Sequence, residues 1–210
     1  MQKIGTVKVI NRDFRRSFDN LPLYLLKADL LYSAHRKDFQ MKIWDLYDRD
    51  ENLTGREWER SKVASIPDGF YHLICEILVR HVDGDFLLMQ RDFSKKLYPG
   101  YWEATASGSA LKGESLLVCA KRELCEETGI TSDNFKEIGH SIEDDKHSIY
   151  HSYLTVVNCA KDSVKLQIGE TMNFKWISKD EFIEFMTTDQ MGRDQIARYS
   201  DYVESLKKAI

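Results

Sequence analysis

The chain has 210 residues, of which 42% are hydrophobic and 30% are charged, a balance typical of a soluble protein with one well-formed core. The 30 Lys and Arg residues and 34 Asp and Glu residues give a net charge of -4, so no overall positive field attracts nucleic acid. No run approaches the roughly 20 apolar residues that cross a bilayer, and the first residues lack the apolar stretch of a signal peptide. We therefore expect a cytoplasmic protein that binds neither nucleic acid nor a membrane.

Four cysteines occur without any C-x-x-C pair, and most of them stand among apolar residues. They are Cys75, Cys119, Cys125 and Cys159. We expect them to be small core residues in a reducing compartment rather than metal ligands or disulfide partners.

Residues 1–40 differ from the rest of the chain in their pattern of apolar and basic residues. They contain a strand-like run at 6–10, three arginines between 12 and 16, and a run at 23–31 that is compatible with a helix. We expect an extension that packs on the remainder of the chain or forms a homodimer. Residues 41–210 are then expected to form the catalytic domain together with C-terminal helices.

The second region begins with strands and turns. Residues 44–48 predict a strand, and residues 72–79 and 86–89 predict a hairpin because Asp83-Gly84 between them is a strong turn signal. A loop containing Pro99-Gly100 leads to a predicted strand at 102–106.

A helix is predicted next, at residues 115–128. Its apolar side chains recur at helical spacing, and Gly129 suits the left-handed conformation that ends a helix. Further strands are expected near 149–157 and 173–177, followed by helices at 179–187 and 193–208. Strands and helices thus alternate, which predicts an α/β fold with helices packed on a sheet.

Three glutamates stand on one side of the helix predicted at 115–128. Glu123, Glu126 and Glu127 fall at i, i+3 and i+4, within an arc of about 100° that adjoins the apolar stripe. Three like charges at the edge of a buried face repel one another and are poorly hydrated, a cost that a cation removes. Carboxylate oxygens favour a hard divalent ion, so the pattern indicates Mg²⁺ or Mn²⁺. A solvated glutamate-rich helix is the alternative for the bare triplet.

The residues around this triplet follow a longer pattern. Its fixed positions match G-x5-E-x7-R-E-U-x-E-E-x-G-U, where U is a bulky aliphatic residue, at Gly108, Glu114, Arg122, Glu123, Leu124, Glu126, Glu127, Gly129 and Ile130. This stretch resembles the Nudix box of the Nudix hydrolases without a departure. The resemblance implies an α/β/α sandwich with a mixed sheet and a Mg²⁺- or Mn²⁺-dependent enzyme. Such an enzyme hydrolyses a nucleoside diphosphate linked to another moiety, so its partner is a small molecule.

The resemblance also implies roles for the residues of the box. Glu126 and Glu127 are expected to be metal ligands, and Glu123 either a ligand or the base that activates water. Gly108 is expected to open the loop and to offer its carbonyl to the metal, while Arg122 pairs with a glutamate and orients it.

Outside the box, a further acid is expected to act as a ligand or as the base. Glu170 stands six residues before Trp176, where many family members carry one, and the cluster at 143–145 is the rival. Arg91 is a candidate for contacting substrate phosphate, with a surface salt bridge as the alternative.

Parts of the chain outside the box resemble the Nudix subgroup nearest to isopentenyl-diphosphate isomerase. They are residues 44–48, 54–55, 69–72 and 87–91. The isomerase needs a cysteine and a metal-binding histidine where this chain has Ser107 and Ser109, and His72 alone keeps a position that resembles an isomerase ligand. A hydroxyl does not readily replace a thiol in proton transfer, so isomerase activity is the lesser alternative. A non-catalytic nucleotide-sensing module is another, and the sequence leaves the substrate undetermined.

Overall fold

A computed structural model describes residues 42–208 of the chain. The strand expected at 6–10, the arginine cluster and the helix expected at 23–31 lie outside these residues. The extension and the dimer expected from residues 1–40 therefore stay predictions.

Two long strands form the centre of the sheet. β3 (His72–His81) and β8 (Ser148–Val157) pair in parallel along their whole length, from His72 opposite Ser148 to His81 opposite Val157. Most of their residues are buried, as expected for strands that are covered on both faces.

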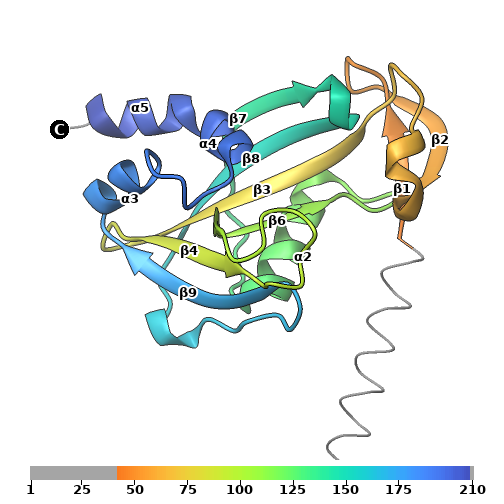
Figure 1. Cartoon of the computed structure of the whole chain (residues 1–210). Helices are drawn as coiled ribbons and strands as arrows, with labels where there is room; N and C mark the ends of the chain where they lie inside the picture. The colour runs from red at the N-terminus through yellow and green to blue at the C-terminus, as the bar shows by residue number, and fades with distance from the viewer. Residues whose placement is uncertain (1–41, 209–210) are drawn as a thin grey trace, which may run out of the picture. The chain divides into compact units, whose positions relative to one another are not determined.

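The remaining strands of this sheet extend on either side of the central pair. They are β4 (Phe86–Arg91), β5 (Trp102–Ala104), β6 (Ala106–Ser109), β7 (Lys136–Glu143) and β9 (Thr171–Ile177). The path through the sheet is β5-β4-β3-β8-β7, while β6 pairs with β3 and β9 pairs with β4. All of these pairings except β3 with β8 are antiparallel, so the seven strands within residues 42–208 form a mixed sheet (Figure 1).

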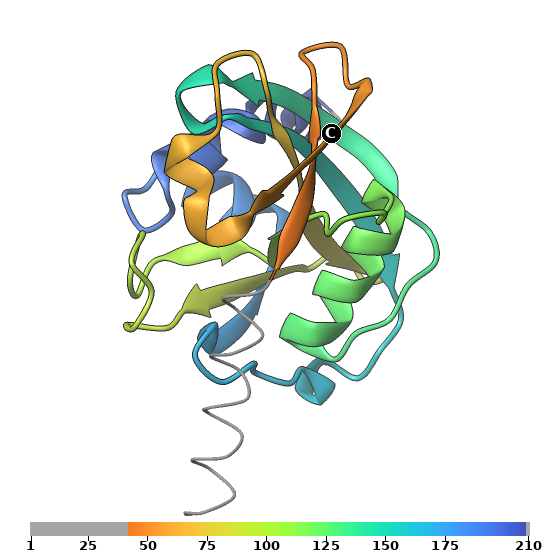
Figure 2. The same ribbon diagram turned by 90° about the vertical axis from the view of Figure 1, so that its right-hand side faces the viewer.

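Helices cover both faces of the sheet. α2 (Leu116–Thr128) lies on one face, and α3 (Lys179–Phe185), α4 (Arg193–Arg198) and α5 (Ser200–Lys208) lie on the other (Figures 1 and 2). Alternate residues of β3 serve two cores, because Cys75 and Ile77 pack with the α2 side while Leu78 packs with the α3 and α5 side. The α/β/α sandwich with a mixed sheet is therefore confirmed.

A separate hairpin lies beside the start of α2. β1 (Ile43–Tyr47) and β2 (Leu53–Glu59) form a two-stranded sheet, followed by the short 3₁₀ segment η1 (Arg60–Ser65). The backbone N–H of Lys112 donates to the Ile43 carbonyl at 2.9 Å, and that of Gly113 donates to Asp45 Oδ2 at 2.6 Å. These bonds hold the loop that precedes α2 against the hairpin.

The predicted helix at 115–128 is confirmed, with Ser115 as its N-cap. The Ser115 hydroxyl accepts from the Val118 N–H at 3.4 Å, and Gly129 ends the helix with a φ of 71°. Gly129 adopts the left-handed conformation that a residue with a Cβ reaches only with strain.

Two expectations about the elements were wrong, and one strand was missed. The strand expected at 102–106 is interrupted at Thr105, whose φ is 40°, and the helix expected at 193–208 is divided at Tyr199 into α4 and α5. β7 was not predicted because it is an edge strand with only partly buried or exposed residues and no apolar run.

Of the cysteines, Cys75 and Cys119 are buried as expected, whereas Cys125 is exposed. No helix among residues 42–208 has the length and apolar character needed to span a bilayer.

Candidate active site

The box glutamates differ in their exposure on α2. Glu123 and Glu127 are only 8% and 6% exposed, whereas Glu126, one residue before Glu127, faces solvent. The structure therefore places two ionisable groups on the buried side of the helix, where charged groups occur only when they are paired or bind a metal.

Arg122 donates hydrogen bonds to three glutamates of the box. Its guanidinium donates to both carboxylate oxygens of Glu114 at 2.8 Å, to Glu123 Oε1 at 2.6 Å and to Glu126 Oε2 at 3.3 Å. Glu114 also accepts from the Leu111 N–H at 2.9 Å, so it closes the loop before α2 rather than capping the helix. Although burial opposes the shift, these bonds lower the pKa of Glu114. Arg122 therefore contacts Glu123 as expected, and its role in orienting that glutamate for catalysis stays a prediction.

Gly108 lies directly against Glu123. A Cβ on this glycine would stand 2.0 Å from Glu123 Oε1, which is closer than any side chain permits. The Gly108 carbonyl oxygen lies 3.5 Å from the thiol sulfurs of both Cys75 and Cys119. Glycine is thus required here so that the Glu123 carboxylate can approach β6, and the carbonyl's role as a metal ligand stays a prediction.

Glu127 is the least compensated acid of the site. Its Oε2 atom is buried and has no hydrogen-bond partner. Burial raises the pKa of Glu127 well above its usual range, and the nearby charges of Glu103, Glu123 and Glu170 add to that shift. Burial also raises the pKa of Glu123, against the opposing effect of Arg122. Glu127 and these three acids therefore form a group of four electrostatically interacting carboxylates from three segments of the chain.

Two of these four acids come from outside the box. Glu170, which was predicted as the further acid, lies in the turn before β9 and forms an ion pair with Lys95. Glu103 on β5 was not predicted; its only signal in the sequence is a charge within a short apolar strand. Burial raises the pKa of Glu103, and Arg91 opposes that shift.

Cations also surround the site. Arg91 Nη1 lies 2.6 Å from Glu103 Oε2, and its Nε donates to the Leu97 carbonyl, so the salt-bridge alternative describes its contacts here. Arg60, at the start of η1, was not predicted, although it interacts electrostatically with Glu170, Glu123 and Glu127. Arg60 and these acids are far apart in the sequence, so local sequence does not reveal their interaction.

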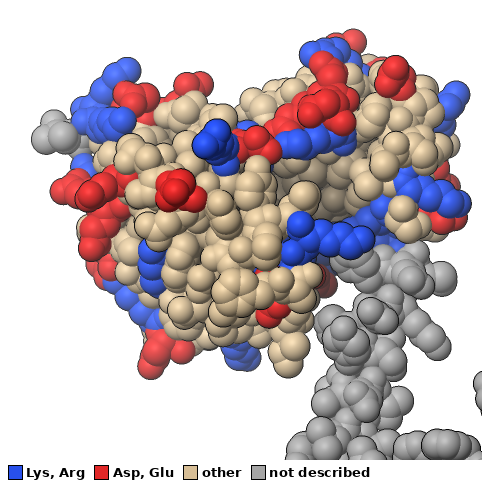
Figure 3. All heavy atoms as spheres, in the orientation of Figure 1, with Lys and Arg blue, Asp and Glu red and all other residues tan. Residues whose placement is uncertain are grey.

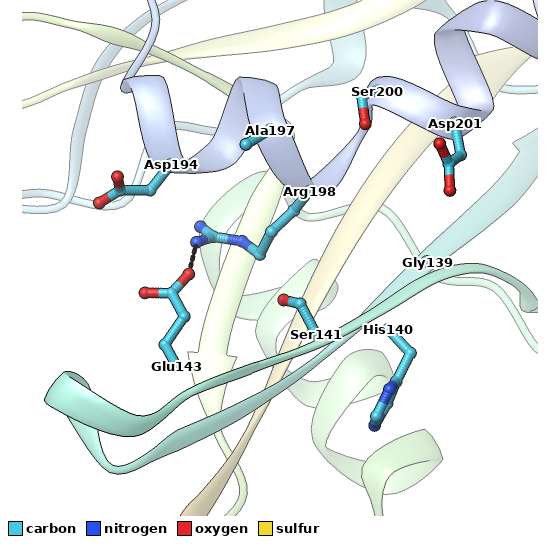
Figure 4. Close-up of a pocket in the computed structure, with 9 residues that line it drawn as sticks. All are labelled: Gly139, His140, Ser141, Glu143, Asp194, Ala197, Arg198, Ser200 and Asp201. Atoms are coloured by element: carbon cyan, nitrogen blue, oxygen red, sulfur yellow. Dashed lines mark hydrogen bonds and ion pairs between the residues drawn. The ribbon is translucent and has the colours of Figure 1, made fainter.

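The rival acidic cluster at 143–145 is engaged elsewhere. Glu143 Oε1 accepts from Arg198 Nη1 at 2.5 Å, and Asp144 Oδ1 accepts from the Tyr71 hydroxyl at 2.5 Å. Glu143 and Arg198 line a pocket of about 310 Å³ between β7 and helices α4 and α5, where they point toward each other (Figure 4). In this structure Glu143 belongs to that pocket.

The residues at positions that matter for isomerase chemistry are His72, Ser107 and Ser109. His72 stacks on Trp44 with ring centroids 3.9 Å apart, and its Nε2 lies 2.9 Å from the Ser148 hydroxyl. Burial lowers the pKa of His72 to about 3, so the ring is neutral. Ser107 and Ser109 lie on β6, in the places where the isomerase has its cysteine and histidine.

The acids around Glu127 fit a divalent cation. They offer carboxylate oxygens, the donors preferred by Mg²⁺ and Mn²⁺, and one buried oxygen of Glu127 lacks a partner. A cation would also offset the burial and the like-charge repulsion that together raise the pKa values of Glu127 and Glu123.

The face of the described region seen in Figure 3 carries interspersed acidic and basic side chains, with broad areas that are neither. That distribution agrees with the net charge of -4.

The comparison with protein families assigns the chain. The model of the NUDIX domain matches residues 71–199, a segment that includes the whole box, β3 and α4. The chain therefore belongs to the NUDIX family, as the box predicted.

Individual relatives agree with this assignment. An uncharacterized Nudix hydrolase of Listeria monocytogenes is 37% identical over 93 residues, 44% of this chain and 54% of that protein. An isopentenyl-diphosphate Delta-isomerase of Dictyostelium discoideum is 26% identical, covering 68% of this chain and 69% of that one. The crystal structure of a MutT protein from Methanosarcina mazei Go1 superposes with a TM-score of 0.53 at 25% identity, covering 66% of this chain and 94% of that one. The chain spans about half the length of the Listeria relative.

Proposed function

We propose that this protein hydrolyses a diphosphate linkage in a nucleoside diphosphate joined to another moiety, using Mg²⁺ or Mn²⁺. The observation that carries the proposal is the buried Glu127 carboxylate, one oxygen of which has no partner and which lies within electrostatic range of three other acids. A purely structural helix would not retain such a group, because an unpaired buried carboxylate destabilises the fold.

The box residues have distinct roles in this proposal. Glu126 and Glu127 bind the metal, and Glu123 binds it or accepts a proton from the attacking water. Arg122 keeps Glu123 in place through the 2.6 Å contact, and Gly108 gives that carboxylate room. When bound, the ion neutralises charge on the diphosphate and lowers the pKa of water.

The residues outside the box supply further groups. Glu170 is the second candidate for the base or for an additional ligand, since its charge already acts on Glu127. Lys95, its ion-pair partner, holds that carboxylate near the site. Arg91 contacts substrate phosphate once its ion pair with Glu103 is released.

The isomerase alternative rests on the resemblance of residues 69–72 and 87–91 and on the Dictyostelium relative. Ser107 and Ser109 argue against it, because the proton-transferring thiol and the metal-binding imidazole of the isomerase are replaced by hydroxyls.

A substrate panel tests the proposal directly. The panel contains ADP-ribose, nucleotide sugars, dinucleoside polyphosphates, NADH, CoA, nucleoside triphosphates and isopentenyl diphosphate, each with Mg²⁺ or Mn²⁺ and with products identified by mass. We expect one compound to be cleaved at a diphosphate, in a reaction that stops on chelation. Isomerised isopentenyl diphosphate would replace the proposal with the isomerase alternative. Silence across the panel, together with tight binding of one nucleotide, would support the non-catalytic module.

A further inference from the structure

A second group of metal-binding side chains lies outside the box. Among residues 42–208, Glu51, His140 and His151 offer ligand atoms that all lie within 4.8 Å of one another. Glu51 Oε1 lies 2.9 Å from His140 Nε2, and Glu51 Oε2 lies 2.8 Å from His151 Nε2. Two imidazole nitrogens and a carboxylate oxygen form a donor set that suits zinc and its neighbours rather than magnesium.

The two histidines are placed by strand pairing. His140 on β7 stands directly opposite His151 on β8, and their ring centroids are 4.8 Å apart. Cross-strand partners share one face of a sheet, so both rings project on the same side. The register shift between Glu137 and Gly139 adds a residue to β7, which brings Glu137 onto this face as well.

Glu137 holds the ring of His151. Its Oε1 atom lies 3.0 Å from His151 Nδ1, while the other ring nitrogen meets Glu51. A neutral imidazole carries one proton and donates to only one of these carboxylates. If Nδ1 donates to Glu137, the lone pair of Nε2 faces an oxygen lone pair of Glu51, a repulsion that a cation between them converts into attraction. A carboxylate on the far nitrogen is also the usual support of a metal-bound histidine.

Glu51 reaches the histidines from another part of the fold. It lies in the turn between β1 and β2 with a φ of 61°, a conformation that is uncommon for a residue with a Cβ. Asp48 supports the turn, because its Oδ1 accepts from the Asn52 N–H at 2.9 Å. The same hairpin contacts the loop before α2 through Asp45. An ion held here would join the hairpin to the edge of the main sheet.

We propose that Glu51, His140 and His151 form a binding site for a divalent transition-metal ion, Zn²⁺ by its donor set, and that this ion fastens the β1–β2 hairpin to β7 and β8. His151 is the buried ligand, with a side chain 9% exposed, and His140 and Glu51 are exposed enough to admit the ion from solvent. A water molecule would complete the coordination of such a three-ligand site.

The test is Zn²⁺ binding to the full chain, measured by competition with a chromophoric chelator in millimolar Mg²⁺ so that the box carboxylates are occupied. We expect one Zn²⁺ per chain, and Co²⁺ in its place should give visible absorption with the intensity of a four-coordinate ion. His140→Gln and Glu51→Gln should each weaken Zn²⁺ binding at least roughly 100-fold. Glu137→Gln should weaken it about 10-fold, because it removes only the support of His151.

Two matched variants distinguish this site from neighbouring acids and from the box. Asp50→Asn removes a neighbouring carboxylate of the same turn and should leave Zn²⁺ affinity unchanged, as should Glu127→Gln in the box. Wild-type chain that binds no Zn²⁺ would show that the cluster is an ion-paired group only. Loss of Zn²⁺ in Glu127→Gln with retention in His140→Gln would place the ion in the box. Either result overturns the proposal, and far-ultraviolet circular dichroism verifies that each variant is folded.

Discussion

Two buried glutamates on opposite faces of the same sheet have contrasting surroundings. Glu76 on β3 accepts from Arg198 at both oxygens, at 2.6 and 3.0 Å, and also from Ser152 at 3.2 Å. Glu127 on α2 has an oxygen without a partner, and other acids act on it. A buried carboxylate with a matched cation belongs to the framework of the fold, whereas one among other acids marks a place for a positively charged ligand.

The largest effect is expected where the framework ion pair is broken. Arg198→Met leaves the Glu76 charge buried without compensation, so the free energy of unfolding should fall by about 3–5 kcal/mol. Chemical denaturation measures this loss. The double variant with Glu76→Gln should recover most of it, because no unpaired charge remains. A loss below about 1 kcal/mol in the single variant would mean that the Glu76 pair is not structural.

The matching change in the acidic site should affect activity instead. Glu127→Gln keeps the shape of the side chain but removes a ligand charge, so kcat/KM on the substrate found by the panel should fall at least roughly 10²-fold. Asp133→Asn, an exposed acid after the end of α2, serves as the matched control. Wild-type turnover in a well-folded Glu127→Gln protein would remove Glu127 from the site.

His72 is a buried ionisable group whose effect on stability depends on pH. Burial lowers the pKa of His72 to about 3, so at acidic pH the unfolded chain takes up a proton that the folded chain excludes. Stability from this group is complete above the unfolded pKa of about 6.5 and decreases as pH falls below it. Between about pH 7.5 and pH 5 the wild type should lose about 2 kcal/mol more than His72→Asn. Parallel pH profiles for the two proteins would contradict the effect of burial on this ring.

The smallest effect is expected at Glu170, which forms an ion pair with Lys95. Glu170→Gln should lower kcat by threefold to about tenfold, with the pH profile of kcat altered if Glu170 is the base. Steady-state kinetics across pH resolve the two contributions. A change below about threefold would assign the further acid to another residue, with Glu103 as the next candidate.

Candidate site residues that lie within one short segment could be identified from the sequence, whereas some that come from distant segments were missed. The helix at 115–128 and its three glutamates follow from residues within one short segment, so pattern and spacing suffice. The pairing of Arg122 was implied by the resemblance of that segment to the Nudix box. Glu103 and Arg60 reach Glu127 only through the packing of β5 and η1, which no local pattern records.

The same contrast holds for the fold. The central hairpin and α2 were predicted because their apolar periodicity and turn residues are strong, whereas β7 was missed because an exposed edge strand lacks that periodicity. The cluster of Glu51, His140 and His151 was also missed. Its geometry depends on the register of β7 against β8, and β7 itself was not predicted.

The most direct test of the central idea, that the acids around Glu127 form a divalent cation site, is thermal unfolding of the wild type and Glu127→Gln with chelator and with Mg²⁺. In chelator, Glu127→Gln should be at least as stable as the wild type because it removes an uncompensated buried charge. Added Mg²⁺ should raise the midpoint of the wild type by several degrees and that of the variant much less, since only a ligand that binds the folded state stabilises it. A wild-type midpoint that Mg²⁺ leaves unchanged, or equal shifts in both proteins, would contradict the assignment of Glu127 to a metal site.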